Sequence, residues 1–166
     1  EGSGYRFDLV TPTQTYKDVY LKAMGRHNLF NAIGALAVLD TGGLPLDKAL
    51  ASLRKFKGIR RRMEVFSLEN KTVVDDYAHH PEEINAVLKT ISEFYPDKRN
   101  MVVFQPHLFS RTQDFMQEFV EVLTQFDEIV LMDIYPAREE PIIGVSSDVF
   151  LELIQNKNKR KISEKD

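Results

Sequence analysis

Short apolar strands alternate with amphipathic helices from residue 63 onward, and this alternation restricts the fold more than any other feature of the chain. Helical spacing of apolar residues follows Pro81, Ser110 and Ser147, and the two serines are expected to cap their helices. Strands that alternate with helices form βα units, so the pattern predicts an α/β fold with a mainly parallel sheet. The predicted strands cover residues 63–68, 72–75, 100–105 and 127–135.

The first 57 residues are organised differently. Strands are expected at residues 5–10 and 16–22, on the two sides of a threonine-rich turn, and two helices are expected to follow them. Gly58 and the three successive arginines at residues 60–62 then separate the second helix from the next strand. We therefore place the main boundary of the chain near residue 57.

Composition argues against several classes of protein. Of the 166 residues, 43% are hydrophobic, which is enough for a sizeable core and argues against wholesale disorder. A net charge of −3 argues against nucleic-acid binding through bulk charge, and the absence of cysteine removes disulfides and thiolate metal sites. No apolar stretch is long enough to span a bilayer, so a cytoplasmic protein with no membrane partner is expected. The basic end, residues 156–166, is interpreted as a solvated tail rather than a recognition element.

Polar and ionisable residues are concentrated where the predicted strands end. In parallel sheets, ligands bind beyond the carboxyl ends of the strands. The strand ending at Asp75 is expected to be the parallel neighbour of the strand ending at Phe104, because the helix after Pro81 supplies a crossover between them. One edge of the sheet would then carry three polar segments, DDYAHHP (75–81), QPHLFSR (105–111) and DIYPAREEP (133–141).

The first of these segments offers several candidate side chains. Asp75 and Asp76 alternate along a strand, so only one of them faces a cleft. His80 precedes Pro81 at the positive end of a helix, where a carboxylate or phosphate is favoured. An aspartate or histidine that only caps the helix is the structural alternative. A metal site is disfavoured, since neighbouring histidines rarely converge on one ion without a third, well-spaced ligand.

Further candidate binding residues lie outside that segment. Arg111, in the first turn of its helix, can hold a carboxylate or phosphate through two hydrogen bonds, and His107 precedes it by one turn. Asn28 and Asn31 stand three residues apart near a helix start, a spacing that suits an adenine edge as well as simple capping. The arginines at residues 60–62 form either a solvated patch or a phosphate-binding group.

Five segments, taken together and in this order, resemble those of the Mur ligase family. They are GRHNLFNAIGAL, FKGIRRRMEVF, VVDDYAHHPEEI, VFQPHLFSRTQDF and DIYPAREEPIIGVSS. The resemblance extends from about Tyr5 to Ile154 and implies a C-terminal ligase domain at residues 58–166, with a Rossmann-like sheet and helices on both of its faces. It implies that residues 1–57 form the C-terminal part of the ATP-binding central domain, a short β-hairpin plus helices.

The resemblance implies an ATP-dependent acid–amino-acid ligase of peptidoglycan synthesis, which serves cell-wall biogenesis, cell shape and cell division. Such enzymes use ATP and Mg²⁺ to phosphorylate a substrate carboxylate, and an amino acid then attacks the acyl phosphate. The segments are most similar to those of family members that use UDP-N-acetylmuramate and L-alanine. This chain has no glycine-rich phosphate loop and no UDP-binding domain, so we expect a fragment, truncated at its end and inactive alone, with metal ligands mostly upstream.

For the nucleotide, the resemblance implies contacts from four residues. Asn28 and Asn31 would contact the adenine. Arg62 and Asp76 would reach the phosphates and ribose of ATP.

For the amino acid or acyl phosphate, the resemblance implies that His80 and Arg111 are catalytic and bind the substrate directly. Tyr77 and His107 would bind substrate beside them. Leu108 stands where some family members carry a further arginine, so this position supplies no second positive charge to bind the substrate.

Two interpretations from other classes stay open at this point. A non-catalytic nucleotide-binding module would bind ATP as this chain alone. A metal-dependent phosphohydrolase would bind divalent metal tightly without nucleotide, and would use Asp75, Asp76, His79 and His80.

Overall fold

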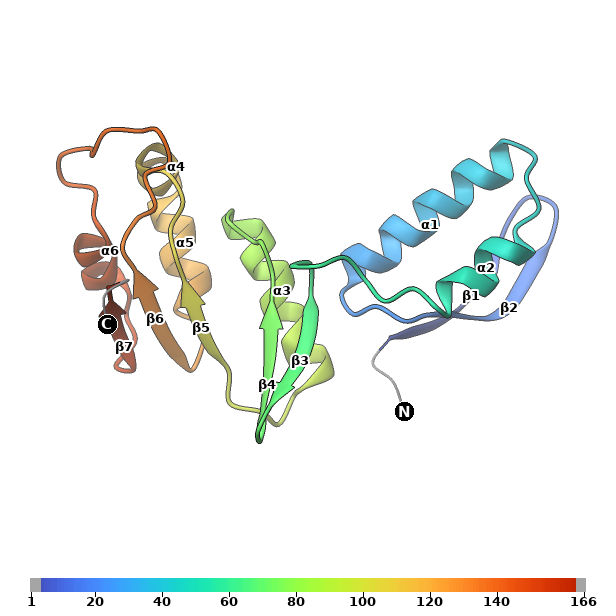
Figure 1. Cartoon of the computed structure of the whole chain (residues 1–166), viewed down its shortest axis with the longest axis horizontal. Coiled ribbons are helices and arrows are strands. Elements are labelled where there is room, and N and C mark those ends of the chain that lie inside the picture. The colour runs from blue at the N-terminus through green and yellow to red at the C-terminus, as the bar shows by residue number, and fades with distance from the viewer. Residues whose placement is uncertain (1–3, 164–166) are drawn as a thin grey trace. The chain divides into compact units, whose positions relative to one another are not determined.

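The computed structural model describes residues 4–163, which form a mixed α/β structure (Figure 1). The chain divides into two compact units. Among the described residues, the first unit contains residues 4–77 and Ser92–Phe94, and the second contains Ala78–Ile91 and residues 95–163. None of the helices within residues 4–163 has the length and apolar character needed to span a bilayer.

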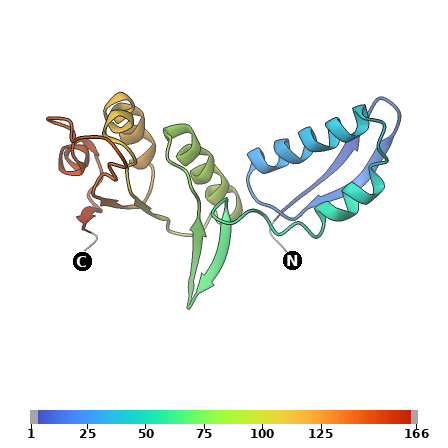
Figure 2. The same cartoon turned by 45° about the horizontal axis from the view of Figure 1, so that its top comes forward.

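The first unit begins with an antiparallel hairpin of β1 (Tyr5–Val10) and β2 (Thr15–Leu21). Two helices follow, α1 (Arg26–Thr41) and α2 (Asp47–Leu53), and both lie alongside the hairpin in Figures 1 and 2. The expected hairpin and helices of this region are thus confirmed. Their shared interior consists of apolar side chains that are almost fully buried: Val19, Leu21, Met24, Leu36 and Leu46.

A second hairpin completes the first unit. It consists of β3 (Glu64–Leu68) and β4 (Lys71–Asp75), joined by a two-residue turn in which Glu69 has the left-handed φ of 54°. The predicted parallel pairing of β4 with the strand ending at Phe104 is wrong, because β4 pairs antiparallel with β3 in a separate two-stranded sheet. The tight turn returns the chain directly onto β3, so this local pairing forms without any crossover.

The second unit is built on a three-stranded parallel sheet in the order β5-β6-β7. The strands are β5 (Met101–Phe104), β6 (Glu128–Met132) and β7 (Lys159–Ile162). Helix α3 (Pro81–Phe94) precedes the sheet, α4 (Phe109–Asp114) and α5 (Met116–Leu123) connect β5 to β6, and α6 (Ser147–Leu153) connects β6 to β7. The predicted α/β fold with a parallel sheet is therefore confirmed.

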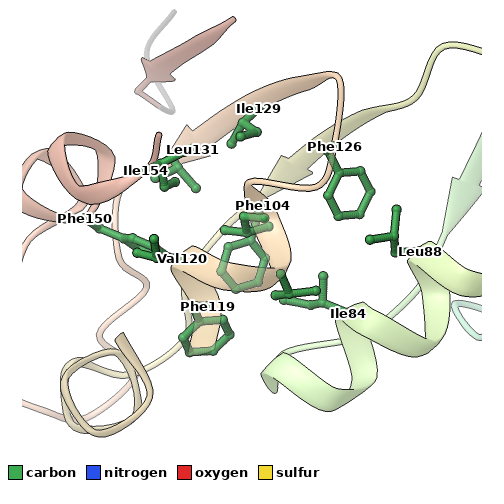
Figure 3. Close-up of a cluster of buried hydrophobic side chains, with 12 residues drawn as sticks. Ile84, Leu88, Phe104, Phe119, Val120, Phe126, Ile129, Leu131, Phe150 and Ile154 are labelled. Carbon is green, nitrogen blue, oxygen red and sulfur yellow. The ribbon is translucent and has the colours of Figure 1, made fainter. Parts of the chain in front are cut away.

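The central strand β6 organises the core of the second unit. Ile129 and Leu131 of β6 are fully buried and face aromatic and aliphatic side chains from the helices. Figure 3 shows Ile84 and Leu88 of α3 pointing toward this cluster, so α3 closes one side of it. The other principal members are Phe104, Phe119, Val120, Leu123, Phe126, Phe150 and Ile154.

Both serine caps predicted from the sequence are wrong. Ser110 lies inside α4, and its hydroxyl bonds to Glu139 instead of to the backbone of its own helix. Helix α6 is capped by Ser146, whose hydroxyl accepts from the Val149 N–H, while the Ser147 hydroxyl donates to the carbonyl of Met132. In both cases a partner distant in sequence, which no local pattern reveals, takes the serine away from capping.

The interpretation of the basic end as a solvated tail is also wrong for its described part, whereas residues 164–166 lie outside the described residues. Lys159–Ile162 form β7, which pairs in parallel with β6. The ammonium of Lys159 donates to two carbonyls at the end of α6, at 2.7 Å each, and Lys161 pairs with Asp148 at 2.6 Å. Arg160 pairs with Glu128. Because each of the three charged side chains of β7 has a partner, this basic segment can form an edge strand.

We predict that Leu123→Ala lowers the free energy of unfolding by about 2–5 kcal/mol, because it leaves a cavity in the core. Leu153→Ala is the matched control, since this helical leucine is 46% exposed whereas Leu123 is 0% exposed. The control should change stability by about 0.5 kcal/mol or less. Urea unfolding of each variant measures the difference, and equal losses would contradict the packing described above.

Candidate functional site

The loops that follow β5 and β6 are joined at the carboxyl edge of the sheet. His107 and Tyr135 form a parallel β-bridge beyond the strand ends. The Leu108 N–H donates to the Tyr135 carbonyl at 2.9 Å, and the Tyr135 N–H donates to the Pro106 carbonyl at 2.8 Å. The rings of His107 and Tyr135 stack, with centroids 5.4 Å apart and planes 21° from parallel. The second and third polar segments are therefore brought together, as the parallel sheet requires.

Arg111 and two histidines gather at this junction. Arg111 Nη1 lies 3.3 Å from His107 Nδ1, and the His79 ring centroid lies 6.2 Å from that of His107. Arginine has no acceptor, so the hydrogen bond requires His107 Nδ1 to accept and places the ring proton on Nε2. We call His79, His107, Arg111 and Tyr135 the His107 cluster.

Charges around His107 favour its neutral form. Burial lowers the pKa of His107, and the positive charges of Arg111 and His79 lower it further, while Glu139 acts in the opposite direction. A neutral imidazole then stands beside a guanidinium that stays charged at any physiological pH. This combination of one fixed cation and hydrogen-bond donors suits a carboxylate or phosphate.

His79 is not among the residues that the family resemblance implies for the substrate, although it belongs to the His107 cluster. Its Nδ1 lies 3.4 Å from the carboxylate of Glu83, four residues later at the start of α3. That i,i+4 spacing of a histidine and a glutamate is the signal in the sequence that could have identified it. The carboxylate orients the imidazole, as second partners of functional histidines commonly do.

His80 lies in different surroundings. It is the N-cap of α3, where Nδ1 accepts from the Glu82 N–H at 3.4 Å and the Glu83 carboxylate accepts from the His80 N–H. Its ring packs edge-on against Phe115 at 4.5 Å. It also lines a pocket of about 280 Å³ between α3 and α5, whose other charged residues are Glu82, Glu118 and Glu121. The structural alternative, a capping histidine, is thus realised, and the acidic lining of this pocket disfavours an anion there.

In the first unit, Arg62 and Tyr77 come together. The guanidinium carbons of Arg61 and Arg62 lie 4.8 and 5.9 Å from the centroid of the Tyr77 ring. The Tyr77 N–H donates to the Arg61 carbonyl at 2.9 Å, and the Asp76 carboxylate accepts from the Met63 N–H at 2.8 Å. Backbone and side-chain bonds thus hold the arginine turn against the end of β4, where two cations lie close together.

The two asparagines of α1 occupy its first two turns. The Asn28 amide donates to the carbonyl of Met24 at 2.7 Å, so it ties the helix start to the preceding loop. Asn31 is exposed on the helix. Asn28 therefore has a structural partner in addition to the adenine contact implied by the family resemblance.

The described residues contain no group of three or more His, Cys, Asp or Glu side chains placed to hold a metal ion. Asp75 stands opposite Glu64 in the β3–β4 ladder, and the Asp76 carboxylate is bonded to Met63. His79 is paired with Glu83. These residues do not fit a Mg²⁺ site, and none of them is given a role in binding a metal.

Comparison with known proteins identifies the class of domain. A family model described as "Mur ligase, glutamate ligase domain" matches residues 61–164, more than half of the chain. The UDP-N-acetylmuramate–L-alanine ligase of Flavobacterium psychrophilum is 49% identical over 163 residues, which are 98% of this chain and 36% of that protein. That of Flavobacterium johnsoniae is 46% identical over 167 residues, or 100% of this chain and 37% of that protein.

A solved structure of the same family has a similar fold. The UDP-N-acetylmuramate–alanine ligase MurC of Thermotoga maritima matches with a TM-score of 0.70 and 27% identity, over 90% of this chain and 32% of that one. The fold and the match together define a ligase domain of the α/β type. The chain belongs to the Mur ligase family, and it spans about a third of the length of the relatives it matches.

We predict that Arg111→Gln raises the pKa of His107 toward its ordinary value of about 6.5, because the variant removes a neighbouring positive charge. Burial, the larger cause, remains, so the pKa should stay below that value. The measurement is an NMR pH titration of the His107 ring proton. Arg138→Gln, which alters an exposed arginine of the next loop, is the control. An unchanged or lower pKa in Arg111→Gln would contradict the contact.

Proposed function

We propose that the whole protein is a UDP-N-acetylmuramate–L-alanine ligase, an ATP-dependent enzyme of peptidoglycan precursor synthesis. The observation that carries this proposal is 49% identity to such a ligase over 98% of the chain. The His107 cluster supports it, because a fixed cation with two imidazoles suits the carboxylate and acyl-phosphate chemistry of that reaction. ATP and a nucleotide-linked sugar as substrates would place the enzyme in the cytoplasm.

The reaction forms one amide bond and consumes one ATP. The muramate carboxylate would attack the γ-phosphorus of ATP, which gives an acyl phosphate and releases ADP. The amine of L-alanine would then attack the acyl carbon, and phosphate leaves as the amide forms. Negative charge grows on the phosphoryl and acyl oxygens during both steps, so positively charged and N–H groups aimed at those oxygens accelerate them. Mg²⁺ is proposed as a cofactor of the whole protein, and none of the residues described above is assigned to hold it.

We assign the amino acid and acyl phosphate to residues of the second unit. Arg111 would hold the alanine carboxylate or the acyl phosphate through its guanidinium, and the Nε2–H of His107 would donate to the same group. We add His79 to this set because of its distance to His107. His80, in the same unit, and Tyr77, in the first unit, stay proposed substrate-binding residues. For His80, the pocket it lines suits a cationic amine better than an anion.

We assign ATP to residues of the first unit. Arg62, beside Arg61 on the Tyr77 ring, would reach the phosphates of ATP together with Asp76, which would also reach the ribose. Asn28 and Asn31 would meet the adenine. A folylpolyglutamate synthase of Mycobacterium tuberculosis, solved with ADP and AMPPCP, has the same fold (TM-score 0.69, 24% identity, 90% of this chain and 33% of that one).

We also propose the division into residues 1–57, the end of an ATP-binding domain, and residues 58–166, a ligase domain. The family match at residues 61–164 supports this boundary. A nucleotide-binding module without catalysis is the second candidate function. Hydrogen bonds hold acidic and basic groups in place beyond β5 and β6, in the second unit. Nucleotide binding by the first unit alone does not need this arrangement, whereas the ligase reaction does.

We predict that Arg111→Ala in the whole protein lowers kcat/KM for L-alanine about 30- to 1000-fold, the loss of a charge-assisted bidentate contact. Arg138→Ala, an exposed arginine in the neighbouring loop, should change it less than about threefold. The measurement is alanine-dependent release of ADP. Unchanged kcat/KM in Arg111→Ala would remove this residue from the proposed site.

We predict that this chain of 166 residues alone releases no ADP in response to L-alanine, because a glycine-rich phosphate loop is absent from it. The assay is the same coupled measurement, with the whole protein as positive control. Alanine-dependent turnover by this chain alone would contradict the prediction. Tight ATP binding by this chain would instead favour the nucleotide-binding module, and isothermal titration calorimetry measures it.

A further inference from the structure

Glu139 extends from the loop after β6 to the first turn of α4. One of its carboxylate oxygens accepts from the Ser110 N–H at 2.9 Å, and the other accepts from the Ser110 hydroxyl at 2.5 Å. These bonds lower the pKa of Glu139, so the carboxylate is charged at neutral pH. A side chain from 29 residues away thus binds the helix that carries Arg111.

Helix α4 needs this partner because it has no cap of its own. The residue at its N-cap is Leu108, whose side chain cannot accept a hydrogen bond and whose φ of 74° is unusual for a residue with a Cβ. A Ser, Thr, Asn or Asp at that position would ordinarily satisfy the first free N–H groups. Here the Glu139 carboxylate supplies the acceptor, and its negative charge also suits the positive end of the helix.

The position of α4 determines the position of Arg111. Arg111 directly follows Ser110 in the helix, and its guanidinium contacts His107. The His107 loop is in turn bonded to Tyr135, which lies four residues before Glu139. No ion pair joins Arg111 to Glu139 within residues 4–163. The carboxylate therefore holds the helix without occupying the guanidinium, which stays available for an anionic ligand.

We infer that Glu139 is a positioning residue, which holds Arg111 and His107 in the arrangement that receives the carboxylate or acyl phosphate, an inference that rests on the function proposed above. Glu139 would act through Ser110 and not by contact with the ligand, because its negative charge would repel a carboxylate or phosphate. Its loss should thus affect the binding of the amino acid more than the binding of ATP.

The test uses the whole protein with Glu139→Ala, Glu139→Gln and the matched control Glu140→Ala, which alters the neighbouring exposed glutamate. Glu139→Ala should raise KM for L-alanine about tenfold, with KM for ATP unchanged and kcat within about threefold. Glu139→Gln should lie between Glu139→Ala and wild type, because its amide oxygen can still accept from the Ser110 N–H. A merely structural role would instead reduce the active fraction and leave both KM values unchanged.

A second measurement is independent of the reaction. Glu139→Gln removes the negative charge that opposes the lowering of the His107 pKa, so an NMR titration should show a still lower pKa, which Glu140→Gln should not. Ser110→Ala removes the hydroxyl contact alone and should also raise KM for L-alanine. This variant replaces Glu139→Ala as the test if Glu139→Ala fails to fold.

The outcomes separate this inference from the proposed function. If the wild-type protein releases no ADP with L-alanine, the proposed function fails, and the titration of His107 still tests the role of Glu139. If Glu139→Gln and Ser110→Ala both match the Glu140 controls in KM and in the His107 titration, the positioning role is overturned.

Discussion

The parallel pairing of β5 with β6 is the constraint on which the second unit depends. Parallel strands end at the same edge of a sheet, so the loops after Phe104 and Met132 leave the sheet side by side. The pairing then continues past the strands as the bridge between His107 and Tyr135. Side chains that lie 28 residues apart in sequence are stacked as a result, and the guanidinium of Arg111 has a fixed neighbour.

Charge is distributed unevenly between the two sides of the α3 start. His79, paired with Glu83, lies near His107 and Arg111, whereas His80 lines a pocket with three glutamates. Adjacent residues in an extended segment point in opposite directions, and His80 has the extended φ of −122° and ψ of 147°. Two consecutive histidines are therefore directed to one cationic and one acidic environment.

The edge strand β7 can form because its charged side chains have partners in β6 and α6. Its lysines and arginine would repel one another in an isolated segment. Against β6 and α6 they meet carboxylates and helix-end carbonyls, and Lys159 donates to the carbonyls of Leu151 and Ile154 at the end of α6. The strand covers one side of β6, whose Val130 and Leu131 are almost completely buried.

Local patterns in the sequence determined most of the element types and the family, and they predicted several candidate site residues. Strands β1 to β6, the helix after Pro81, and the placement of Arg111 one turn after His107 follow from the spacing of apolar and charged residues over a few positions. Only the tertiary structure decided the partners: β4 pairs with β3, Ser110 bonds to Glu139, His79 joins His107, and a basic tail becomes β7. The physical reason is that each of these depends on contacts between residues far apart in the chain, whose energies exceed the local preferences of a serine to cap or of a lysine-rich segment to remain solvated.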